Sequence, residues 1–516
     1  MPEPLARQER PSSARAWAIA RALLLVGLVA AAGYWLFADT VRKYAPSVGR
    51  RPLRVSFWGP FQEFRMWKTM LANFRRRHPD VPVRMEYFPS RYEQKIGQLL
   101  VADDAPDVIL YQDEPFPNII EHDPNRGIEP KFANLTRLSR RLGEGEACTR
   151  EALLKTFWRT SVEYFGRWEG PGEDRAWQQY ALPVWGGCNL FYYNKACFRR
   201  AGIRLATLPG PEGLVRDPNG GWLLDDEHWD LREFVEVCKL LTLDEDGDGR
   251  KEQFGLSLNS SVYWLPLHYA CGADILNAER TRTVFLGPAV ERSLRLWQDL
   301  MYTYRATPRS AELGQMNEGV GFFTGRVAMF CSGPWGMPFL NEAHLDYDVL
   351  HVPRNPETRR RATRITWDCV AVAAGSTKKA EAWRLVRHLT SMESMRVVAD
   401  VQRSIPARKE ARDYFISVNP RVTVRKFVET AGSYARMQPI TKHWSIMTRA
   451  WGDAMRELRR ENADERLTPA EAIGMFHADA RLGKVLPPAD ADRAARYRRL
   501  YDERRTRRAA RKEPAP

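Results

Sequence analysis

The chain has 516 residues, of which 44% are hydrophobic and 28% are charged. These values are ordinary for a globular protein and exclude a wholly disordered chain, a collagen-like fibre and a polytopic membrane protein. The formal net charge of +15 is concentrated at the ends, because residues 1–54 carry +6 and residues 490–516 carry +5. The remaining body is nearly neutral, which argues against a nucleic-acid-binding protein, since that class needs a basic face on its folded domain.

Near the N-terminus, residues 22–38 form an uncharged run, ALLLVGLVAAAGYWLFA, that follows four arginines. The run has the length of a short membrane-spanning helix, and the arginines favour a cytoplasmic N-terminus. We therefore expect residues 1–21 in the cytoplasm, a transmembrane anchor at 22–38 and the rest of the chain on the periplasmic or extracellular face. A signal peptide cleaved after the small residues Ala30, Ala31 and Ala32 is the alternative.

The seven cysteines are scattered, without a CxxC pair or a Cys/His cluster of zinc spacing. Such a set does not make a disulfide framework. We expect most of these cysteines to be small buried hydrophobic residues, with one or two disulfides as the alternative in an oxidising compartment.

After the N-terminal segment, strand patterns alternate with helix patterns. Short β-branched and aromatic runs indicate strands, and apolar residues at helical spacing indicate helices. The expected strands are residues 53–58, 81–88 and 107–111, and the expected helices are residues 64–78 and 92–102. This order predicts a parallel sheet with helices on its faces, and ligands of such sheets bind beyond the carboxyl ends of the strands.

Strand and helix patterns also follow one another in the later part of the chain, from residue 181 to residue 480. Residues 181–195 indicate a glycine-containing loop followed by an aromatic strand, and residues 322–337 a turn, a strand and a Gly-Pro-Trp loop. Further helices are expected at 229–241, 286–305 (with Pro288 in the first turn), 379–389 and within 437–480, and a strand at 366–374. The Arg-rich residues 490–516 indicate a solvated helix or a disordered tail.

Seven segments, in order, resemble the extracellular solute-binding proteins of ABC importers, specifically the maltose-binding-protein-like, carbohydrate-binding family. Residues 182–195 resemble the family strand that ends in Tyr-Asn-Lys, here Tyr193, Asn194 and Lys195, and residues 325–335 resemble its Gly-Pro-Trp segment. The other five segments are residues 198–203 (FRRAGI), 229–242, 244–255, 383–391 and 405–407 (IPA).

This resemblance implies a two-lobed, type II periplasmic-binding-protein-like α/β fold with a ligand cleft between the lobes. It implies residues 53–185 plus 366–410 for lobe 1 and 186–365 plus 411–480 for lobe 2, with hinge strands near 181–193 and 362–370. It also implies that the protein binds a carbohydrate and presents it to a membrane permease, with no required cofactor.

A carbohydrate site needs flat aromatic platforms and a few convergent polar groups. The 17 tryptophans exceed what a chain of this size needs for packing, and several aromatic residues fall on expected strand ends and loops. Trp335 and Tyr111 match the family's ligand positions best, whereas Gly187 stands where some maltose-type relatives carry a carboxylate. The expected ligand-binding residues are Trp58, Tyr111, Asp113, Glu114, Trp185, Trp264, Trp335, Trp367, Asp368 and Trp444. Core packing is the alternative for each aromatic residue, and a solvated loop charge for each acid.

Asp244, Asp246 and Asp248, followed by Gly249, match the first half of a calcium-binding loop. The twelfth position is Gly255, where such a loop requires a bidentate Glu, and Glu252 at the ninth position compensates only in part. Two interpretations of this loop therefore stay open, a calcium site and a metal-free turn.

The HExxH, GxSxG and P-loop motifs are absent from the sequence. We therefore expect a binding protein rather than an enzyme. A membrane-anchored sensory or scaffold protein that reuses the same fold is the main alternative, and a carbohydrate-active enzyme that uses two carboxylates is a weaker one.

Overall fold

The computed structural model describes residues 27, 28, 31, 33, 34 and 51–510, except 124, 126, 145–146, 207–212, 259–260, 310–311 and 313–317. Most of the expected membrane segment, residues 22–38, lies outside the described residues. No helix within the described part combines the length and the apolar character that crossing a membrane requires.

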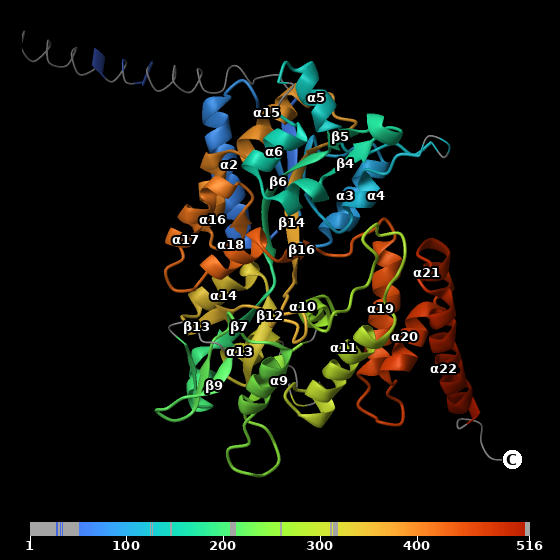
Figure 1. The fold of residues 1–516 in the computed structure, drawn as a ribbon. Coiled ribbons are helices and arrows are strands. Elements are labelled where there is room, and N and C mark those ends of the chain that lie inside the picture. The colour runs from blue at the N-terminus through green and yellow to red at the C-terminus, as the bar shows by residue number, and fades with distance from the viewer. Residues whose placement is uncertain are drawn as a thin grey trace, which may run out of the picture.

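The chain folds around two main sheets, one above the other in Figure 1. The upper sheet has the order β15-β6-β14-β3-β1-β2, and β16 also pairs with β14. Strands β1, β2 and β3 are parallel, as the alternating pattern predicts, whereas β14 runs antiparallel to both β3 and β6. Its strands are β1 (Leu53–Phe57), β2 (Val83–Tyr87), β3 (Val108–Gln112), β6 (Ala181–Cys188), β14 (Thr363–Val372), β15 (Ile405–Pro406) and β16 (Ala435–Met437).

The longer helices that cover the upper sheet bury an apolar stripe at helical spacing. In α2, for example, the buried residues include Met66, Trp67, Met70 and Phe74. The helices of this region are α2 (Phe61–Arg77), α3 (Tyr92–Val101), α4 (Phe116–Ile119), α5 (Leu135–Arg141), α6 (Arg150–Thr156), α7 (Arg159–Tyr164), α15 (Lys379–Leu389), α16 (Met392–Asp400), α17 (Arg412–Ser417) and α18 (Arg425–Gly432). A separate hairpin joins β4 (Gly166–Glu169) to β5 (Ala176–Gln179).

The lower sheet has the order β11-β12-β7-β13, with β7 antiparallel to both of its neighbours. Its strands are β7 (Leu190–Asn194), β11 (Phe254–Ser257), β12 (Val327–Ser332) and β13 (Tyr347–Leu350). A small sheet, β8 (Ile203–Leu205), β9 (Leu214–Arg216) and β10 (Trp222–Leu224), lies beside it. The helices here are α8 (Lys195–Arg200), α9 (Leu231–Leu240), α10 (Leu265–Ala270), α11 (Pro288–Gln298), α13 (Glu318–Phe323) and α14 (Met337–Glu342). A π-helical turn (Asp299–Thr303) extends α11, which starts at Pro288 as expected.

The segment 181–195 differs from the expectation of one loop and one strand. It forms two strands that belong to different sheets, β6 above and β7 below, and Asn189 is the residue between them. Gly186 and Gly187 lie within β6 and pair with Trp367 and Thr366 of β14. The extended backbone thus passes from one sheet to the other without a loop, which makes this segment a hinge strand.

The structure also differs in detail from the expected division into lobes. Residues 186–188 and β16, both assigned to lobe 2 by the sequence, hydrogen-bond to β14 in the upper sheet. We use "lobe 1" for the upper sheet with its helices and "lobe 2" for the lower sheet with its helices. The chain passes between them at Asn189, between β13 and β14, and again after β16.

The C-terminal helices pack beside lobe 2 (Figure 1). They are α19 (Trp444–Leu458), α20 (Pro469–Ala478), α21 (Ala480–Val485) and α22 (Ala491–Ala510). The described part of the Arg-rich tail is therefore helical over Ala491–Ala510, and it is docked rather than fully solvated. Ala494 and Tyr497 of α22 are buried, and Gly474 of α20 permits the approach because a Cβ there would lie 2.1 Å from the Tyr497 carbonyl oxygen.

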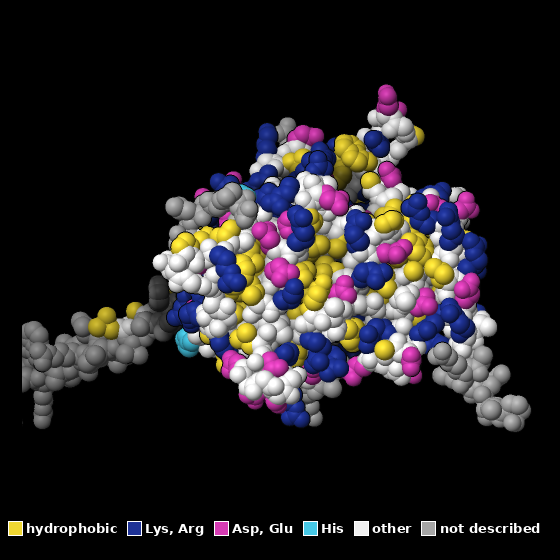
Figure 2. All heavy atoms as spheres, turned by 60° about the horizontal axis from the view of Figure 1, so that its bottom comes forward, with side chains coloured by type: hydrophobic (Ala, Val, Ile, Leu, Met, Phe, Trp, Pro, Cys, Tyr) yellow, Lys and Arg dark blue, Asp and Glu magenta, His cyan; other side chains and the backbone are white. Residues whose placement is uncertain are grey.

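Buried residues form an apolar core that continues through both sheets. All seven cysteines are buried and unbridged, in agreement with the sequence. On the face shown in Figure 2, Lys and Arg side chains are interspersed with Asp and Glu side chains. This mixed surface agrees with the nearly neutral charge of the body of the chain.

Candidate ligand-binding site

Four strands of lobe 1 present their ends at one edge of the sheet. Because β14 pairs antiparallel with β3 and β6, the start of β14 meets the carboxyl ends of the other two, with Asp368 opposite both Gln112 and Trp185. The end of β1 lies at the same edge, since β1 and β3 are parallel. We call this the inner edge, defined as residues 58, 112–114, 185–187 and 366–368. It collects six of the ten expected ligand residues, which are Trp58, Asp113, Glu114, Trp185, Trp367 and Asp368.

Asp113 is buried just after β3. One of its carboxyl oxygens accepts a hydrogen bond from Thr366 Oγ1 (2.9 Å), and the other lies 3.4 Å from the Trp367 backbone nitrogen, which donates to it. Burial, and then the neighbouring Glu114, raise the pKa of Asp113 to about 7. This carboxyl group therefore changes its charge near neutral pH.

Asp368 accepts a hydrogen bond from the indole Nε1 of Trp185 at 2.7 Å. Trp185 in turn packs edge-on against Trp67 of α2, with ring centroids 5.9 Å apart. Burial raises the pKa of Asp368 well above its usual range, and the charges of Glu63 and Asp113 add to this effect. Asp368 as a whole residue is partly exposed.

Glu63 and Arg403 form an ion pair beside Asp368 that the sequence analysis did not identify. Glu63 is 4% exposed in the first turn of α2, and its carboxylate folds back over Gly59. A Cβ on Gly59 would overlap that carboxylate, and the backbone φ of +130° there also favours glycine. The Gly-Pro pair after β1 was the available signal for this turn, but nothing in the sequence connected it to Arg403.

A second Arg–carboxyl group surrounds Glu114. Arg364 Nη1 donates to Gln438 Oε1 (2.6 Å) and lies 3.8 Å from Glu114 Oε1, while Gln438 Nε2 donates to that same Glu114 oxygen at 3.0 Å. The Arg364 guanidinium also lies 5.8 Å from the ring centroid of Tyr263, which belongs to lobe 2. The sequence analysis missed Arg364, Gln438 and Tyr263, because they are far apart along the chain and match no motif.

Two half-buried tryptophans provide aromatic surface here. Trp58 packs against Tyr92, with ring centroids 4.7 Å apart. Trp335, in the Gly-Pro-Trp loop of lobe 2, lies over two glycines: a Cβ would come within 2.2 Å of its ring at Gly333 and 3.1 Å at Gly187. Because Gly187 belongs to the inner edge, the absence of side chains at both positions lets the lobe 2 loop reach lobe 1.

Five of the expected aromatic ligand residues are packed inside the protein, and one of them is Trp185 of the inner edge, which is 3% exposed. Tyr111 is 3% exposed and meets Phe132 edge-on, and Trp367 is fully buried with its Nε1 donating to Thr160 Oγ1 at 3.0 Å. Trp264 is also fully buried, and Trp444 is 8% exposed at the start of α19. Trp264 donates to Ser293 Oγ (2.8 Å) and stacks on Trp297, so it belongs to the core of lobe 2. These side chains support the structure around the cleft but offer little surface to a ligand.

The acidic loop brings three carboxylates together, although not the three expected. Ligand atoms of Asp244, Asp246 and Glu252 lie within 4.8 Å of one another. Asp248 is not in this group, and its Oδ1 accepts from the Arg250 backbone nitrogen at 2.7 Å. Lys251 Nζ lies 3.1 Å from Asp244 Oδ2, so part of the negative charge is already balanced by a lysine.

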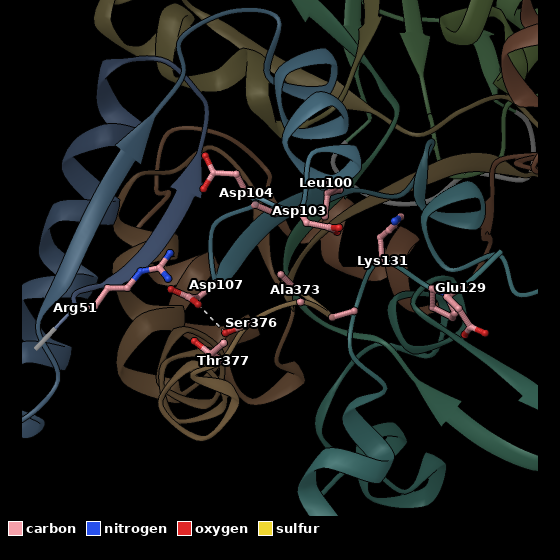
Figure 3. A pocket seen from close by; sticks show the side chains of 14 residues that line it. Arg51, Leu100, Asp103, Asp104, Asp107, Glu129, Lys131, Ala373, Ser376 and Thr377 are labelled. Atoms are coloured by element: carbon pink, nitrogen blue, oxygen red, sulfur yellow. Dashed lines mark hydrogen bonds between the residues drawn. The ribbon is translucent and has the colours of Figure 1, made fainter. Parts of the chain in front are cut away.

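A separate polar cavity of about 350 Å³ lies at the outer end of lobe 1 (Figure 3). Its lining includes Arg51, which precedes β1, Asp107, which precedes β3, and Ser376, which follows β14. Asp107 accepts hydrogen bonds from Ser376 Oγ (2.6 Å) and the Arg54 backbone nitrogen (2.9 Å). This cavity is therefore at the opposite end of the strands from the inner edge, and its buried acid joins the ends of three strands.

Comparison with known proteins identifies the family. Residues 69–423 match the family described as bacterial extracellular solute-binding protein, and the chain belongs to this family. Binding proteins of Brucella abortus and Brucella suis are 23% identical over 283 residues, which is 54% of this chain and 62% of each relative. The chain thus matches less than two thirds of the length of these curated relatives.

Solved structures show the same two-lobed fold. An ABC substrate-binding protein of Listeria monocytogenes, in complex with cycloalternan, has a TM-score of 0.65 and 18% identity, covering 84% of this chain and 98% of its own. The GacH receptor of Streptomyces glaucescens, also solved with acarbose, has a TM-score of 0.61 and 19% identity, covering 84% and 99%. At these identities the likeness establishes the two-lobed α/β architecture.

Proposed function

We propose that this protein is the solute-binding component of an ABC importer and that it binds a carbohydrate between its lobes. The observation that carries the proposal is the meeting of Trp335 of lobe 2 with the inner edge of lobe 1 at Gly187. This contact places a half-buried indole beside the edge that carries Asp368 and Glu114. Indole faces stack on the C–H faces of sugars, and carboxylates accept hydrogen bonds from hydroxyl groups.

In this proposal, ligand binding closes the lobes about the hinge strands, and the closed form engages a membrane permease. A ligand shifts such an equilibrium only if it contacts the closed state better than the open one. Trp335 and Tyr263 of lobe 2 and Asp368 of lobe 1 are placed to provide contacts from both sides. An extracellular family implies a periplasmic or extracellular location, and we propose that residues 22–38 tether the protein to the cytoplasmic membrane.

The test is differential scanning fluorimetry of the full chain, in detergent, against mono- and oligosaccharides, polyols and sugar phosphates. A ligand that binds only the native state raises the melting temperature by mass action. We expect a sugar to produce a shift that Trp335→Ala reduces, with affinity falling roughly 10–100-fold, the loss typical of one well-placed aromatic contact.

Trp168→Ala is the matched control, because Trp168 is 49% exposed on the β4–β5 hairpin, away from the inner edge. It should leave the shift unchanged. Absence of a shift with every compound would refute the carbohydrate part of the proposal. Retention of sugar binding without association with any permease would instead favour a sensory or scaffold protein.

We also propose that Asp244, Asp246 and Glu252 bind calcium weakly. The support is the convergence of three hard oxygen ligands, one of which, Asp244 Oδ1, is buried without a hydrogen-bond partner. Calcium binding would require Lys251 to leave Asp244, which lowers the affinity. Isothermal titration with CaCl₂ should show heat that Asp244→Asn abolishes, and an identical titration of both proteins would support the metal-free turn.

A further inference from the structure

The inner edge and the side chains around it carry more negative than positive groups. Among the described residues, four carboxyl groups at its centre interact with two guanidinium groups. The carboxyl groups belong to Glu63, Asp113, Glu114 and Asp368, and the guanidinium groups to Arg364 and Arg403. When all four carboxyl groups are ionised, the cluster has a net charge of −2.

Each of the two arginines already pairs with a carboxylate other than that of Asp368. Arg403 pairs with Glu63, and Arg364 lies against Glu114 and Gln438. Asp368 has only the neutral indole of Trp185 as its hydrogen-bond donor among the described residues. An ionised carboxyl group in a largely dehydrated place needs a counter-charge, because burial of an unpaired charge is unfavourable.

Protons supply this compensation when the cleft holds no ligand. Burial raises the pKa values of Glu63, Asp113 and Asp368, and mutual repulsion strengthens the effect for Asp113 and Asp368. A solute that brings its own positive charge would replace these protons and turn the repulsion into attraction. An anionic solute such as a sugar phosphate would meet the same carboxylates with a repulsive interaction.

We propose that the solute of this cleft carries a protonated amine, and that it belongs to the class of polyhydroxylated amines, such as amino sugars. This inference rests on the proposed carbohydrate function and narrows it. In this arrangement Asp368 and Glu114 accept hydrogen bonds from the ammonium group, and Trp335 and Trp58 stack on the apolar faces of the rings. Asp113 acts from behind them through its charge, since Thr366 and the Trp367 backbone already occupy both of its oxygens.

The first experiment compares three ligands that differ at a single position: chitosan oligosaccharides with a free amine, their N-acetylated counterparts, and cello-oligosaccharides with a hydroxyl group. Isothermal titration of the full chain at pH 6.5, where a large part of the sugar amine still carries its proton, measures each affinity. We expect the amine to bind at least about tenfold more tightly than its N-acetylated form, the difference that one charge-assisted hydrogen bond contributes. Equal affinity, or tighter binding of the neutral forms, would overturn the inference.

The second experiment uses two variants. Asp368→Asn keeps the shape of the side chain and removes its charge, so it should abolish the preference for the amine while neutral oligosaccharides still bind. Asp413→Asn is the control, because that carboxylate is 82% exposed on α17 and should not affect binding. If Asp368→Asn weakens amine and neutral ligands equally, Asp368 serves only as a hydroxyl acceptor and the inference fails.

The third measurement is the pH dependence of binding. The charged and titratable groups that face Asp113 are Glu114 on its own strand end, Arg364, Asp368 and Cys369 on β14, and Tyr164 on α7. Affinity for the amine should first rise with pH as the carboxyl groups lose protons, and should fall again once the sugar amine, a weaker base than a lysine amine, loses its own proton near neutral pH. A flat profile would contradict the exchange of protons for the ligand's charge.

These outcomes separate the two proposals. Binding of neutral sugars without a preference for amines defeats this inference and leaves the carbohydrate function intact. Absence of binding by all three oligosaccharide series, together with no shift in the broader sugar panel, defeats both.

Discussion

Asp107 and Asp113 stand at opposite ends of the same buried strand, β3, and the structure uses them differently. Asp107, at the outer end, accepts hydrogen bonds from Ser376 and the Arg54 backbone, and thereby joins the ends of three strands. Asp113, at the inner edge, also accepts two hydrogen bonds, but it lies beside Glu114 and close to Asp368. Both aspartates are buried, but Asp107 stabilises the fold, whereas Asp113 contributes to a cluster of acids that could interact with a ligand.

The comparison shows that the surroundings of a carboxyl group decide its role. At the outer end the two carboxyl oxygens of Asp107 each accept one hydrogen bond, from the Ser376 hydroxyl and from the Arg54 backbone nitrogen. At the inner edge several acids share too few positive groups, and the balance is left to protons or to a ligand. Changes at the two ends of lobe 1 should therefore have separable effects on stability and on binding.

The largest effect should come from a residue that belongs to the core although its type suggested a binding role. Trp264→Ala should lower the free energy of unfolding by about 3–5 kcal/mol, because it removes a fully buried indole and its hydrogen bond to Ser293. Chemical denaturation measures this loss. The ligand affinity of the folded fraction should stay within about twofold of that of the unmodified protein. A loss of binding without a loss of stability would show instead that Trp264 contacts the ligand.

Next in size is the acid at the outer end. Asp107→Ala should reduce stability by about 2–3 kcal/mol, since it leaves the Ser376 hydroxyl and the Arg54 amide buried without an acceptor. Urea denaturation measures the change, and ligand titration should give an unaltered affinity. A lowered affinity at unchanged stability would show that the two ends of the sheet are not separable.

A smaller and pH-dependent effect is expected from the acid at the inner edge. Because folding raises the pKa of Asp113 from 3.8 to about 7, the folded state keeps a proton that the unfolded state loses between these values. Stability in the ligand-free protein should therefore fall as the pH rises from 4 to 7. Asp113→Asn should remove part of this fall in stability and raise the free energy of unfolding at pH 8 by on the order of 1–2 kcal/mol. Denaturation at several pH values measures this difference.

The opposite sign, a variant that is less stable than the unmodified protein at pH 8, would mean that Asp113 is ionised and paired in the folded protein. In that case the protein would already hold a counter-charge for it, and the argument for a cationic solute would weaken.

The smallest effect should come from the rim of the outer cavity. Asp103 is exposed there, and Asp103→Asn should change the free energy of unfolding by less than about 0.5 kcal/mol. It should also leave binding of every sugar unchanged in a titration. If it alters ligand affinity, the outer cavity rather than the inner edge holds a ligand, and the comparison between the two ends is reversed.

Local elements of the fold were predictable because helices and strands have local hydrophobic periods. The helix at 379–389 and the strand and helix pairs of residues 53–111 appear close to their expected bounds. The division of residues 181–195 into β6 and β7 was not predictable, because an extended run of apolar residues looks the same whether it serves one sheet or two. Likewise, the assignment of β16 to the upper sheet depends on pairing with β14, far away in sequence.

The candidate site was predictable only in part, for the same reason. Trp58 and Asp113 could be named because ligands bind beyond the carboxyl ends of parallel strands. Trp185 and Asp368 could be named from their places in an expected loop and near the start of an expected strand. Glu63 and Arg403 escaped notice, as did Arg364 and Gln438, because the first pair is 340 residues apart in the sequence and the second pair 74. The sequence also did not show which tryptophans are buried: Trp335 is half-buried, whereas Trp264 is fully buried.

The sequence by itself determined the family, the alternation of strands and helices, and the type of side chain available for binding, since these depend on residues near one another in the chain. The tertiary structure decided which acids share a small space and which tryptophans reach it. It also decided how many positive groups balance the acids, because electrostatic energy and burial depend on distances that only the folded chain sets.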